Sequence, residues 1–328
     1  MPWERGGFLA PEVLVVTGPT AAGKTGLGIR LAQLFDGEVV SADSMQVYRG
    51  MDIGTAKPTV GEMAGVRHHM LDVADPAERY SAARYVSEAT VCVTDILERG
   101  KLPVLVGGTG LYIDALLRGQ TFASGERGDA GCDSTRAGLV LRYDDEGGAV
   151  LWQALAQVDP EASARIHPND KNRIVRALEV FAVTGETITA HNRASCAVPP
   201  RYTALQIAVT ARERADLYQR IDARVDAMVA DGLRQEVLAL LASGLAPGGT
   251  SMQAIGYKEV AHALAGAGTF EAAVEDIKRE SRRYAKRQLS WLRRKEAVQW
   301  ILWDGAPDPV AMAREASALC QAVGIAVR

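Results

Sequence analysis

Short apolar runs alternate with amphipathic segments along the first third of the chain. Residues 13–17 (VLVVT) form a run rich in β-branched side chains that ends at a glycine, and residues 38–40 and 102–106 form two more. Apolar residues recur with helical spacing from Thr25 and again over 82–97. Continuous apolar runs predict strands buried on both faces, and strands that alternate with helices predict a parallel sheet. We therefore expect an α/β fold built on a parallel, P-loop NTPase-like sheet.

The pattern changes after Gly119. Residues 119–135 are polar and rich in glycine, which predicts an irregular segment and a domain boundary. Helical stretches follow over 149–183, interrupted by two prolines, and a second linker with a Pro-Pro pair is expected at 194–202. These two linkers enclose a mainly helical insertion, for which we take the bounds 119–202.

The chain is expected to return to the first sheet after the insertion. Residues 205–209 again resemble a strand, helices dominate to about Glu296, and 298–303 predict a final strand. We therefore predict a core made of residues 12–118 and 203–328, which includes a basic helix near the C-terminus.

Composition excludes several classes of protein. The 328 residues are 48% hydrophobic and 23% charged, with a net charge of −3, which is ordinary for a globular protein of two domains. No stretch is long and apolar enough to cross a membrane, and charged residues and proline interrupt the N-terminal segment, so we expect neither a membrane span nor an export signal. The four cysteines lie far apart and form no CxxC pair, which predicts free thiols in a reducing cytoplasm.

A phosphate-binding motif follows the first predicted strand. Residues 18–25 (GPTAAGKT) match GxxxxGK[ST] between a strand and a helix. The glycines let the backbone curl so that successive N–H groups face an anion, Lys24 adds a positive charge, and the Thr25 hydroxyl suits Mg²⁺. The motif predicts a phosphate or diphosphate ligand without identifying the group attached to it.

Asp43 lies at the carboxyl end of the second predicted strand, at the edge where open α/β sheets bind their ligands. An aspartate there could bind Mg²⁺ through water, act as a general base, or cap a turn, and its position leaves all three roles open. The segment 50–58 that follows is too polar and rich in glycine to be a simple connection.

The strand at 102–106 ends in glycine at the same edge. Many P-loop NTPases have an aspartate for Mg²⁺ in this neighbourhood, so the sequence Gly107-Gly108-Thr109-Gly110 argues against NTP hydrolysis. Tight helix packing explains one glycine more readily than three, so we expect bare backbone close to a ligand. His68 and His69 are expected to be structural, because no other His or Cys has metal-ligand spacing.

The segment 278–295 has nine basic side chains and one acidic one. Ile277, Tyr284 and Trp291 recur every seven residues, so one face of the predicted helix can pack while the other stays positive. Charged helix faces normally mix signs, and a face of one sign suits a polyanion. Next to a phosphate-binding loop, this pattern favours RNA as a partner.

These motifs together resemble the tRNA dimethylallyltransferases, which transfer an isoprenoid group to N6 of adenosine 37 beside the anticodon. The resemblance covers nearly the whole chain, with eight blocks in the family's order. The blocks are GPTAAGKT, SADSMQVYRGMDIGTAKP, HHMLD, GGTGLY, RIHPNDKNRIVRALEV, RIDARVDAM, SMQAIGYKE and YAKRQLSWLRR.

The resemblance implies a P-loop-like core, an insertion domain that binds the tRNA anticodon stem-loop, dimethylallyl diphosphate as donor, Mg²⁺, and a monomer. It makes Asp43 the general base and Arg224 an active-site arginine, beside Lys24 and Thr25, with Thr25 as the metal ligand. The diphosphate would be held by Gly18, Pro19, Thr20, Ala21, Ala22, Gly23, Lys24 and Thr25. The tRNA would contact Asp43, Ser44, Met45, Gln46, Thr109, Arg136, Asn172, Arg173, Ile174, Val175, Arg176, Gln253 and Lys258.

The chain departs from the family pattern in one segment and lacks one domain. A longer stretch, 120–135, replaces the usual proline-containing segment before Arg136, and the zinc finger of the larger eukaryotic members is absent.

Two other functions fit part of the sequence. A P-loop small-molecule kinase accounts for 18–25 and Asp43 but not for the insertion or the basic helix. A non-catalytic RNA-binding protein accounts for the basic helix but not for Asp43.

Overall fold

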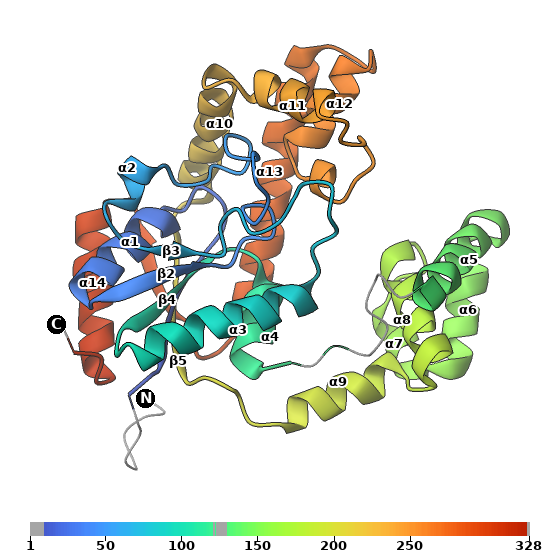
Figure 1. The fold of residues 1–328 in the computed structure, drawn as a ribbon, viewed down its shortest axis with the longest axis horizontal. Helices are drawn as coiled ribbons and strands as arrows, with labels where there is room; N and C mark the ends of the chain where they lie inside the picture. The colour runs from blue at the N-terminus through green and yellow to red at the C-terminus, as the bar shows by residue number, and fades with distance from the viewer. Residues whose placement is uncertain (1–9, 121, 123–129, 327–328) are drawn as a thin grey trace. The chain divides into compact units, whose positions relative to one another are not determined.

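A parallel sheet forms the centre of the larger part of the chain (Figure 1). The computed structural model describes residues 10–120, 122 and 130–326. Six strands pair in parallel in the order β3-β2-β4-β1-β5-β6. Their bounds are β1 Val13–Thr17, β2 Gly37–Ser41, β3 His68–His69, β4 Leu102–Gly107, β5 Ala204–Ala211 and β6 Gln299–Trp303. The predicted parallel α/β core is confirmed.

Strand β1 lies between β4 and β5 in the sheet and is buried on both faces. Its five residues are all buried, and Leu14 and Val16 point into the main hydrophobic cluster. Helices α1 (Lys24–Leu34) and α14 (Pro309–Ala322) contribute to that cluster and pack against each other. The unbroken apolar run in β1 therefore reflects helices above and below it.

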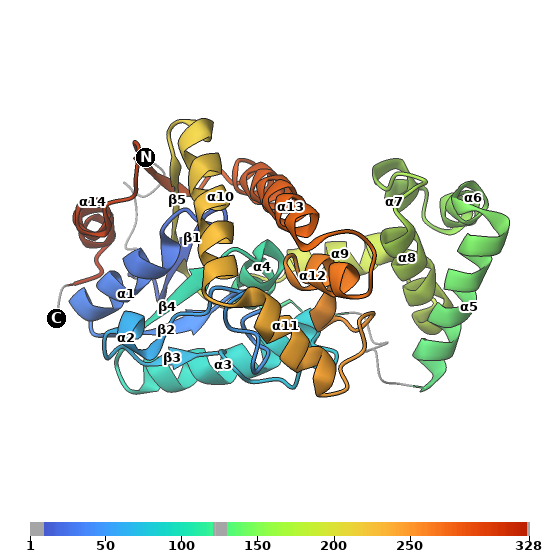
Figure 2. The same ribbon diagram turned by 90° about the horizontal axis from the view of Figure 1, so that it is seen from above.

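The helices α3 (Ala82–Glu98), α4 (Gly110–Arg118) and α13 (Phe270–Leu292) lie on the other face of the sheet (Figures 1 and 2). Tyr85 of α3 stacks on Tyr112 of α4 at 4.1 Å between ring centroids, and its hydroxyl donates to the Ser41 carbonyl at the end of β2. The remaining helices of this part are α2 (Val60–Met63), α10 (Arg214–Ala230), α11 (Leu233–Ala242), the 3₁₀ turn η1 (Ser251–Gln253) and α12 (Tyr257–Leu264).

The chain divides into two compact units. One comprises Met1–Leu117 with Tyr202–Arg328, and the other comprises Arg118–Arg201. The second unit consists of α5 (Ala130–Glu146), α6 (Gly148–Val158), α7 (Pro160–Arg165), α8 (Lys171–Thr184) and α9 (Ile188–Ala197). Leu151, Leu155, Ile174 and Ala177 form the centre of its own hydrophobic cluster.

Two helices extend into the segments expected to be irregular. Helix α5 already begins at Ala130, and its Leu139 and Tyr143 pack on the cluster of its unit. Helix α9 continues to Ala197, with Thr187 capping its start by accepting the Ala190 N–H. The expected linkers are therefore shorter than 119–135 and 194–202. Residues 121 and 123–129 lie outside the described part.

Cys92 and Cys320 are free thiols. None of the described helices is long and apolar enough to cross a membrane.

A charged network fixes the edge strand β3. The Glu38 carboxylate in β2 is 5% exposed, accepts from Arg99 at the end of α3 at 2.8 Å, and lies 2.7 Å from His69 Nε2 in β3. The hydrogen bond from Arg99 lowers the pKa of Glu38 from its ordinary 4.5 to about 2, with help from His69 and against the effect of burial. His69 is thus a structural residue of the sheet edge.

The Glu38 network should stabilise the fold in a pH-dependent way. Because the folded-state pKa is depressed, the stabilisation is complete above about pH 4.5 and is lost as the pH falls toward about 2. Glu38→Gln should lower the free energy of unfolding near neutral pH by on the order of 3 kcal/mol. Urea unfolding of both proteins over a range of pH measures the difference, and a difference that does not shrink in acid would contradict this role.

Candidate active site

The loop after β1 is shaped by glycines that no other residue can replace without strain. Gly18 has φ 147°, and a Cβ there would lie 2.2 Å from the Val209 carbonyl oxygen of β5. Gly23 has φ 90° and caps the start of α1. The loop therefore turns tightly between strand and helix, as the motif predicts.

Three carbonyl groups of this loop accept hydrogen bonds from side chains. Lys24 Nζ donates to the Pro19 carbonyl at 2.7 Å, and Trp303 Nε1 donates to the Ala22 carbonyl at 3.1 Å. Arg220 Nε donates to the Ala21 carbonyl at 3.2 Å. The N–H groups of residues 23–25 open helix α1, where the first N–H groups have no partner within the helix and favour an anion.

A cavity of about 310 Å³ lies beside the loop. Thr20, Lys24 and Thr25 line it from the loop, and Gly18, Pro19, Ala21, Ala22 and Gly23 shape the loop behind them. The other polar side chains of the wall are Ser41, Asp43, Ser44, Gln46, Thr55, His68, Arg224, Gln253, Ser281, Tyr284, Arg287 and Gln288. The apolar side chains are Val39, Met45, Pro58, Leu71, Val106, Ile221, Val225, Met228, Ala254, Ile255 and Ile277.

Lys24, Arg224 and Asp43 form the charged centre of the cavity. Burial and the neighbouring Arg224 lower the pKa of Lys24 to about 7, and Asp43 opposes this shift. Burial also lowers the pKa of Arg224, again opposed by Asp43. The Arg224 Nε is buried and has no hydrogen-bond partner among the described residues. Two cationic groups beside one carboxylate suit an anionic ligand that brings acceptor oxygens.

Asp43 also caps the turn that follows β2. Its Oδ1 accepts the N–H groups of Met45 at 2.9 Å and Gln46 at 3.4 Å. The carboxylate therefore holds the turn and also lines the cavity, so the capping role is confirmed, and the other two roles stay predictions.

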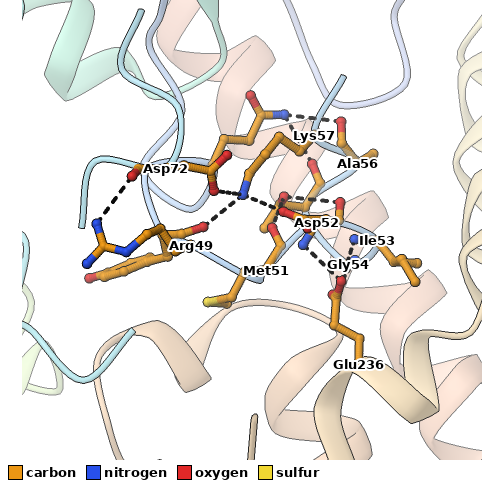
Figure 3. A network of polar contacts seen from close by, with 12 residues as sticks. Arg49, Met51, Asp52, Ile53, Gly54, Ala56, Lys57, Asp72 and Glu236 are labelled. Atoms are coloured by element: carbon orange, nitrogen blue, oxygen red, sulfur yellow. Dashed lines mark hydrogen bonds and ion pairs between the residues drawn. The ribbon is translucent and has the colours of Figure 1, made fainter. Parts of the chain in front are cut away.

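The segment 52–57 forms one wall of the cavity and is held from both sides (Figure 3). Glu236 of α11 accepts the N–H groups of Asp52 at 2.9 Å, Ile53 at 2.8 Å and Gly54 at 3.1 Å. Lys57, whose side chain is 5% exposed, pairs with Asp52 at 2.5 Å and with a second carboxylate, that of Asp72, at 2.6 Å. The expectation that this loop is more than a connection agrees with this network.

The same loop meets two predicted site residues on its inner side. Gln46 Nε2 donates to the carbonyls of Thr55 and Ala56, both at 3.2 Å, and Arg224 donates to the Thr55 carbonyl at 3.4 Å. The Gln46 amide is thus committed to the wall of the cavity. Sequence reasoning missed Glu236 and Lys57, because only the folded chain brings them to this segment.

Thr109 and Lys258 lie outside the cavity lining. Thr109 Oγ1 accepts the Ser44 N–H at 3.0 Å, which ties the end of β4 to the Asp43 turn. Lys258 pairs with Glu259 at 3.4 Å.

Packing against neighbouring groups accounts for Gly107 at the end of β4 and for Gly108 and Gly110 after it, which is more than the sequence suggested. Gly107 also lines the cavity, in agreement with the bare backbone expected at this edge. A Cβ on Gly107 would lie 2.2 Å from the Ala42 carbonyl oxygen, and one on Gly108 would lie 2.2 Å from Gln288 Nε2. A Cβ on Gly110 would lie 2.5 Å from the Trp291 ring. Each glycine admits a neighbouring protein group.

The positive stripe on α13 is smaller than the sequence suggests. Lys278 pairs with Asp226 at 2.8 Å, and Arg282 pairs with Asp222, both acids lying on α10. Arg279 and Arg283 pair with acids of their own helix. Among the described residues, the exposed side chains without a carboxylate partner on this helix and just beyond it are Lys286, Arg287, Arg293 and Arg294.

The tRNA residues predicted in the second unit divide into exposed and buried ones. Asn172 and Arg173 are exposed near the start of α8. Ile174 and Val175 are both 0% exposed, so their side chains pack inside the unit, and contact of this stretch with tRNA stays a prediction. They face inward because an amphipathic helix must bury its apolar stripe.

Arg136 and Arg176 lie together in the second unit. Both pair with Glu179 at 3.1 Å, and Glu179 is 1% exposed. Their guanidinium groups balance the negative charge of the buried Glu179 carboxylate.

Comparisons with known proteins agree with these features. The family model described as IPP transferase matches residues 46–295. A tRNA dimethylallyltransferase of Pelotomaculum thermopropionicum is 44% identical over 303 residues, which cover 92% of this chain and 94% of the relative.

Two solved structures are also similar to the chain. The tRNA isopentenylpyrophosphate transferase of Bacillus halodurans is 43% identical with a TM-score of 0.67, covering 95% of this chain and 98% of its own. A eukaryotic dimethylallyltransferase acting on tRNA is 28% identical with a TM-score of 0.79, covering 97% of this chain and 81% of its own. With its phosphate-binding loop, its facing aspartate and this similarity along almost its whole length, the chain belongs to the IPP transferase family.

Proposed function

We propose that this protein transfers a dimethylallyl group from dimethylallyl diphosphate to N6 of adenosine 37 in tRNA, giving N6-isopentenyladenosine and diphosphate. The observation that carries the proposal is a single cavity that Asp43 shares with Lys24, Thr25 and Arg224. A base for the nucleophile and cations for the leaving group are the two requirements of this reaction, and the cavity supplies both.

The diphosphate would bind at the start of α1. The helix N-terminus, Lys24 and Arg224 favour negative charge there, and the unpartnered Arg224 Nε is a donor ready for a phosphate oxygen. Apolar side chains of the same cavity, such as Ile221, Val225 and Ile277, suit the dimethylallyl tail. The pocket thus fits a ligand that is anionic at one end and apolar at the other.

Asp43 would act on the nucleobase. The adenine N6 amine is a weak nucleophile because its lone pair is delocalised into the ring, so a carboxylate that accepts its proton assists formation of the C–N bond. As this bond forms, the bond between the allylic carbon and the diphosphate oxygen breaks, and its electrons leave with the diphosphate. Lys24 and Arg224 stabilise this growing charge, and extrusion of the base from a loop requires no duplex opening.

Mg²⁺ fits the residues present. The Thr25 hydroxyl lines the cavity, and Mg²⁺ commonly takes one or two protein ligands together with phosphate oxygens and waters. Among the described residues there is no cluster of three His, Cys, Asp or Glu that could hold a metal without such a ligand. When bound, the ion would neutralise charge on the leaving diphosphate.

The tRNA partner and the setting follow from the same features. The exposed Asn172 and Arg173, the exposed basic side chains of α13 and cavity residues such as Gln253 would contact the anticodon stem-loop. We propose a monomer, because one unit of one chain supplies every residue that lines the cavity. We propose the cytoplasm as its location, because tRNA is available there. The kinase alternative is not favoured, since the relatives are tRNA dimethylallyltransferases and β4 ends in glycine.

Asp43→Asn is the sharpest test of the general base. The amide oxygen of the new side chain can still accept the Met45 and Gln46 N–H groups, so the turn is kept while the proton acceptor is lost. Single-turnover transfer to an anticodon stem-loop with saturating donor should slow by about 10²–10⁴-fold. Affinity for the RNA should stay within about threefold, and an unchanged rate removes Asp43 from this role.

Arg173→Gln tests the RNA surface of the second unit. Removal of one phosphate contact should weaken stem-loop binding and reduce the slope of log K against log salt by about 1, with little effect on the rate at saturating RNA. Ile174→Val is the matched control, because its buried side chain should influence stability but leave RNA affinity unchanged. Equal salt slopes for the wild type and Arg173→Gln would exclude the contact.

A further inference from the structure

A single buried amide connects the two glycine loops beside the cavity. Gln288 of α13 is 7% exposed and lines the cavity. Its Oε1 accepts the Thr20 N–H of the loop after β1 at 2.9 Å, and its Nε2 donates to the Gly108 carbonyl after β4 at 3.0 Å. One side chain therefore accepts a hydrogen bond from the first loop and donates one to the second.

The surroundings leave room for this amide and little else. A Cβ on Gly108 would overlap Nε2 at 2.2 Å and would lie 3.4 Å from the Gly18 carbonyl oxygen of the first loop. The two loops are thus adjacent, and glycine at 108 allows the amide to enter between them. Since Thr20 N–H is satisfied by Gln288, this loop amide shapes the phosphate site without being a donor to the anion.

The loop after β4 is hydrogen-bonded to both neighbours of Asp43 in the chain. Thr109 follows Gly108, and its N–H donates to the Ala42 carbonyl at 3.1 Å while its Oγ1 accepts the Ser44 N–H at 3.0 Å. Ala42 and Ser44 are the two neighbours of Asp43 in the chain. Hydrogen bonds therefore lead from Gln288 through Thr109 to the residues on either side of the carboxylate.

We propose that Gln288 is a positioning residue for the transfer reaction, which holds the diphosphate loop and the Asp43 turn at a fixed separation. The proposal rests on the roles proposed above for that loop and for Asp43. In-line displacement requires the base and the leaving group at a set distance on opposite sides of one carbon, and small misplacement slows such a step strongly. Only an amide side chain of this length both accepts from Thr20 and donates to Gly108.

The test compares Gln288→Leu and Gln288→Glu with Ser290→Ala on the same helix. Leucine keeps the volume but loses both hydrogen bonds, and a glutamate carboxylate accepts from Thr20 but has no N–H for Gly108. Ser290 is exposed, and its hydroxyl donates to the Lys286 carbonyl of its own helix, so its replacement by alanine should leave the transfer rate unchanged. Single-turnover transfer should fall by about 10²-fold in both Gln288 variants, while the affinity for inorganic diphosphate changes by less than about tenfold.

A second measurement separates positioning from a loss of folding. In a cycle with Thr109→Val, which removes the side-chain link to Ser44 and keeps the backbone bond to Ala42, the Gln288→Leu change should slow transfer less than it does alone, because both substitutions weaken the same path. Three results would overturn the proposal. The rate losses of the two substitutions could multiply in the double variant, or the Gln288 variants could transfer within about threefold of the wild-type rate. The loss of rate could also follow the fraction of unfolded protein in thermal melting. If the wild type itself fails to bind inorganic diphosphate, the proposed role of the loop fails instead.

Discussion

The site depends on the meeting of strand ends at one edge of the parallel sheet. β1 leads into the loop of Lys24, β2 leads into Asp43, and β4 leads into the glycine loop, so cations and carboxylate arrive from different parts of the sequence. Parallel strands place their carboxyl ends together, and open α/β sheets bind ligands there. Burial lowers the pKa of both Lys24 and Arg224, and the Asp43 carboxylate partly offsets this because it favours their protonated forms.

Helices from the C-terminal part complete this edge and explain why the cavity needs the whole first unit. Arg224 comes from α10, Gln288 from α13, and Glu236 of α11 holds the wall loop. The chain leaves the sheet after α4 for the second unit and returns at β5 before it supplies these residues. Local motifs near the N-terminus are thus necessary for the site but do not complete it.

Features encoded by neighbouring residues could be predicted from the sequence, and features that depend on distant partners could not. The glycines and lysine of 18–25 specify the loop by themselves, so its place between β1 and α1 is confirmed. Strand β3 has two residues and depends on the contact of His69 with Glu38, which no local pattern announces. Asp222 and Asp226, which neutralise two cations of α13, lie more than 50 positions away from them.

Other features had a signal in the sequence that was not used. Ile174 and Val175 were named within a family block, and two adjacent apolar residues in an amphipathic helix are expected to turn their side chains to a core, as they do here. Outside the motifs, Asp308 followed by Pro309 is a typical helix start, and the structure places α14 there, on the face opposite to α3. Residue type and helical period decide which member of a block is able to reach a ligand.

The depressed basicity of Lys24 gives the cavity an adjustable charge. Burial and the neighbouring Arg224 lower the pKa of Lys24 to about 7, so its ammonium form is less favoured at neutral pH than that of an exposed lysine. If the loop binds diphosphate as proposed above, the anion would favour the ammonium form, and binding would be coupled to the uptake of a proton. Such coupling would spare a poorly hydrated space from holding two permanent cations, because positive charge would grow there as the anion arrives to balance it.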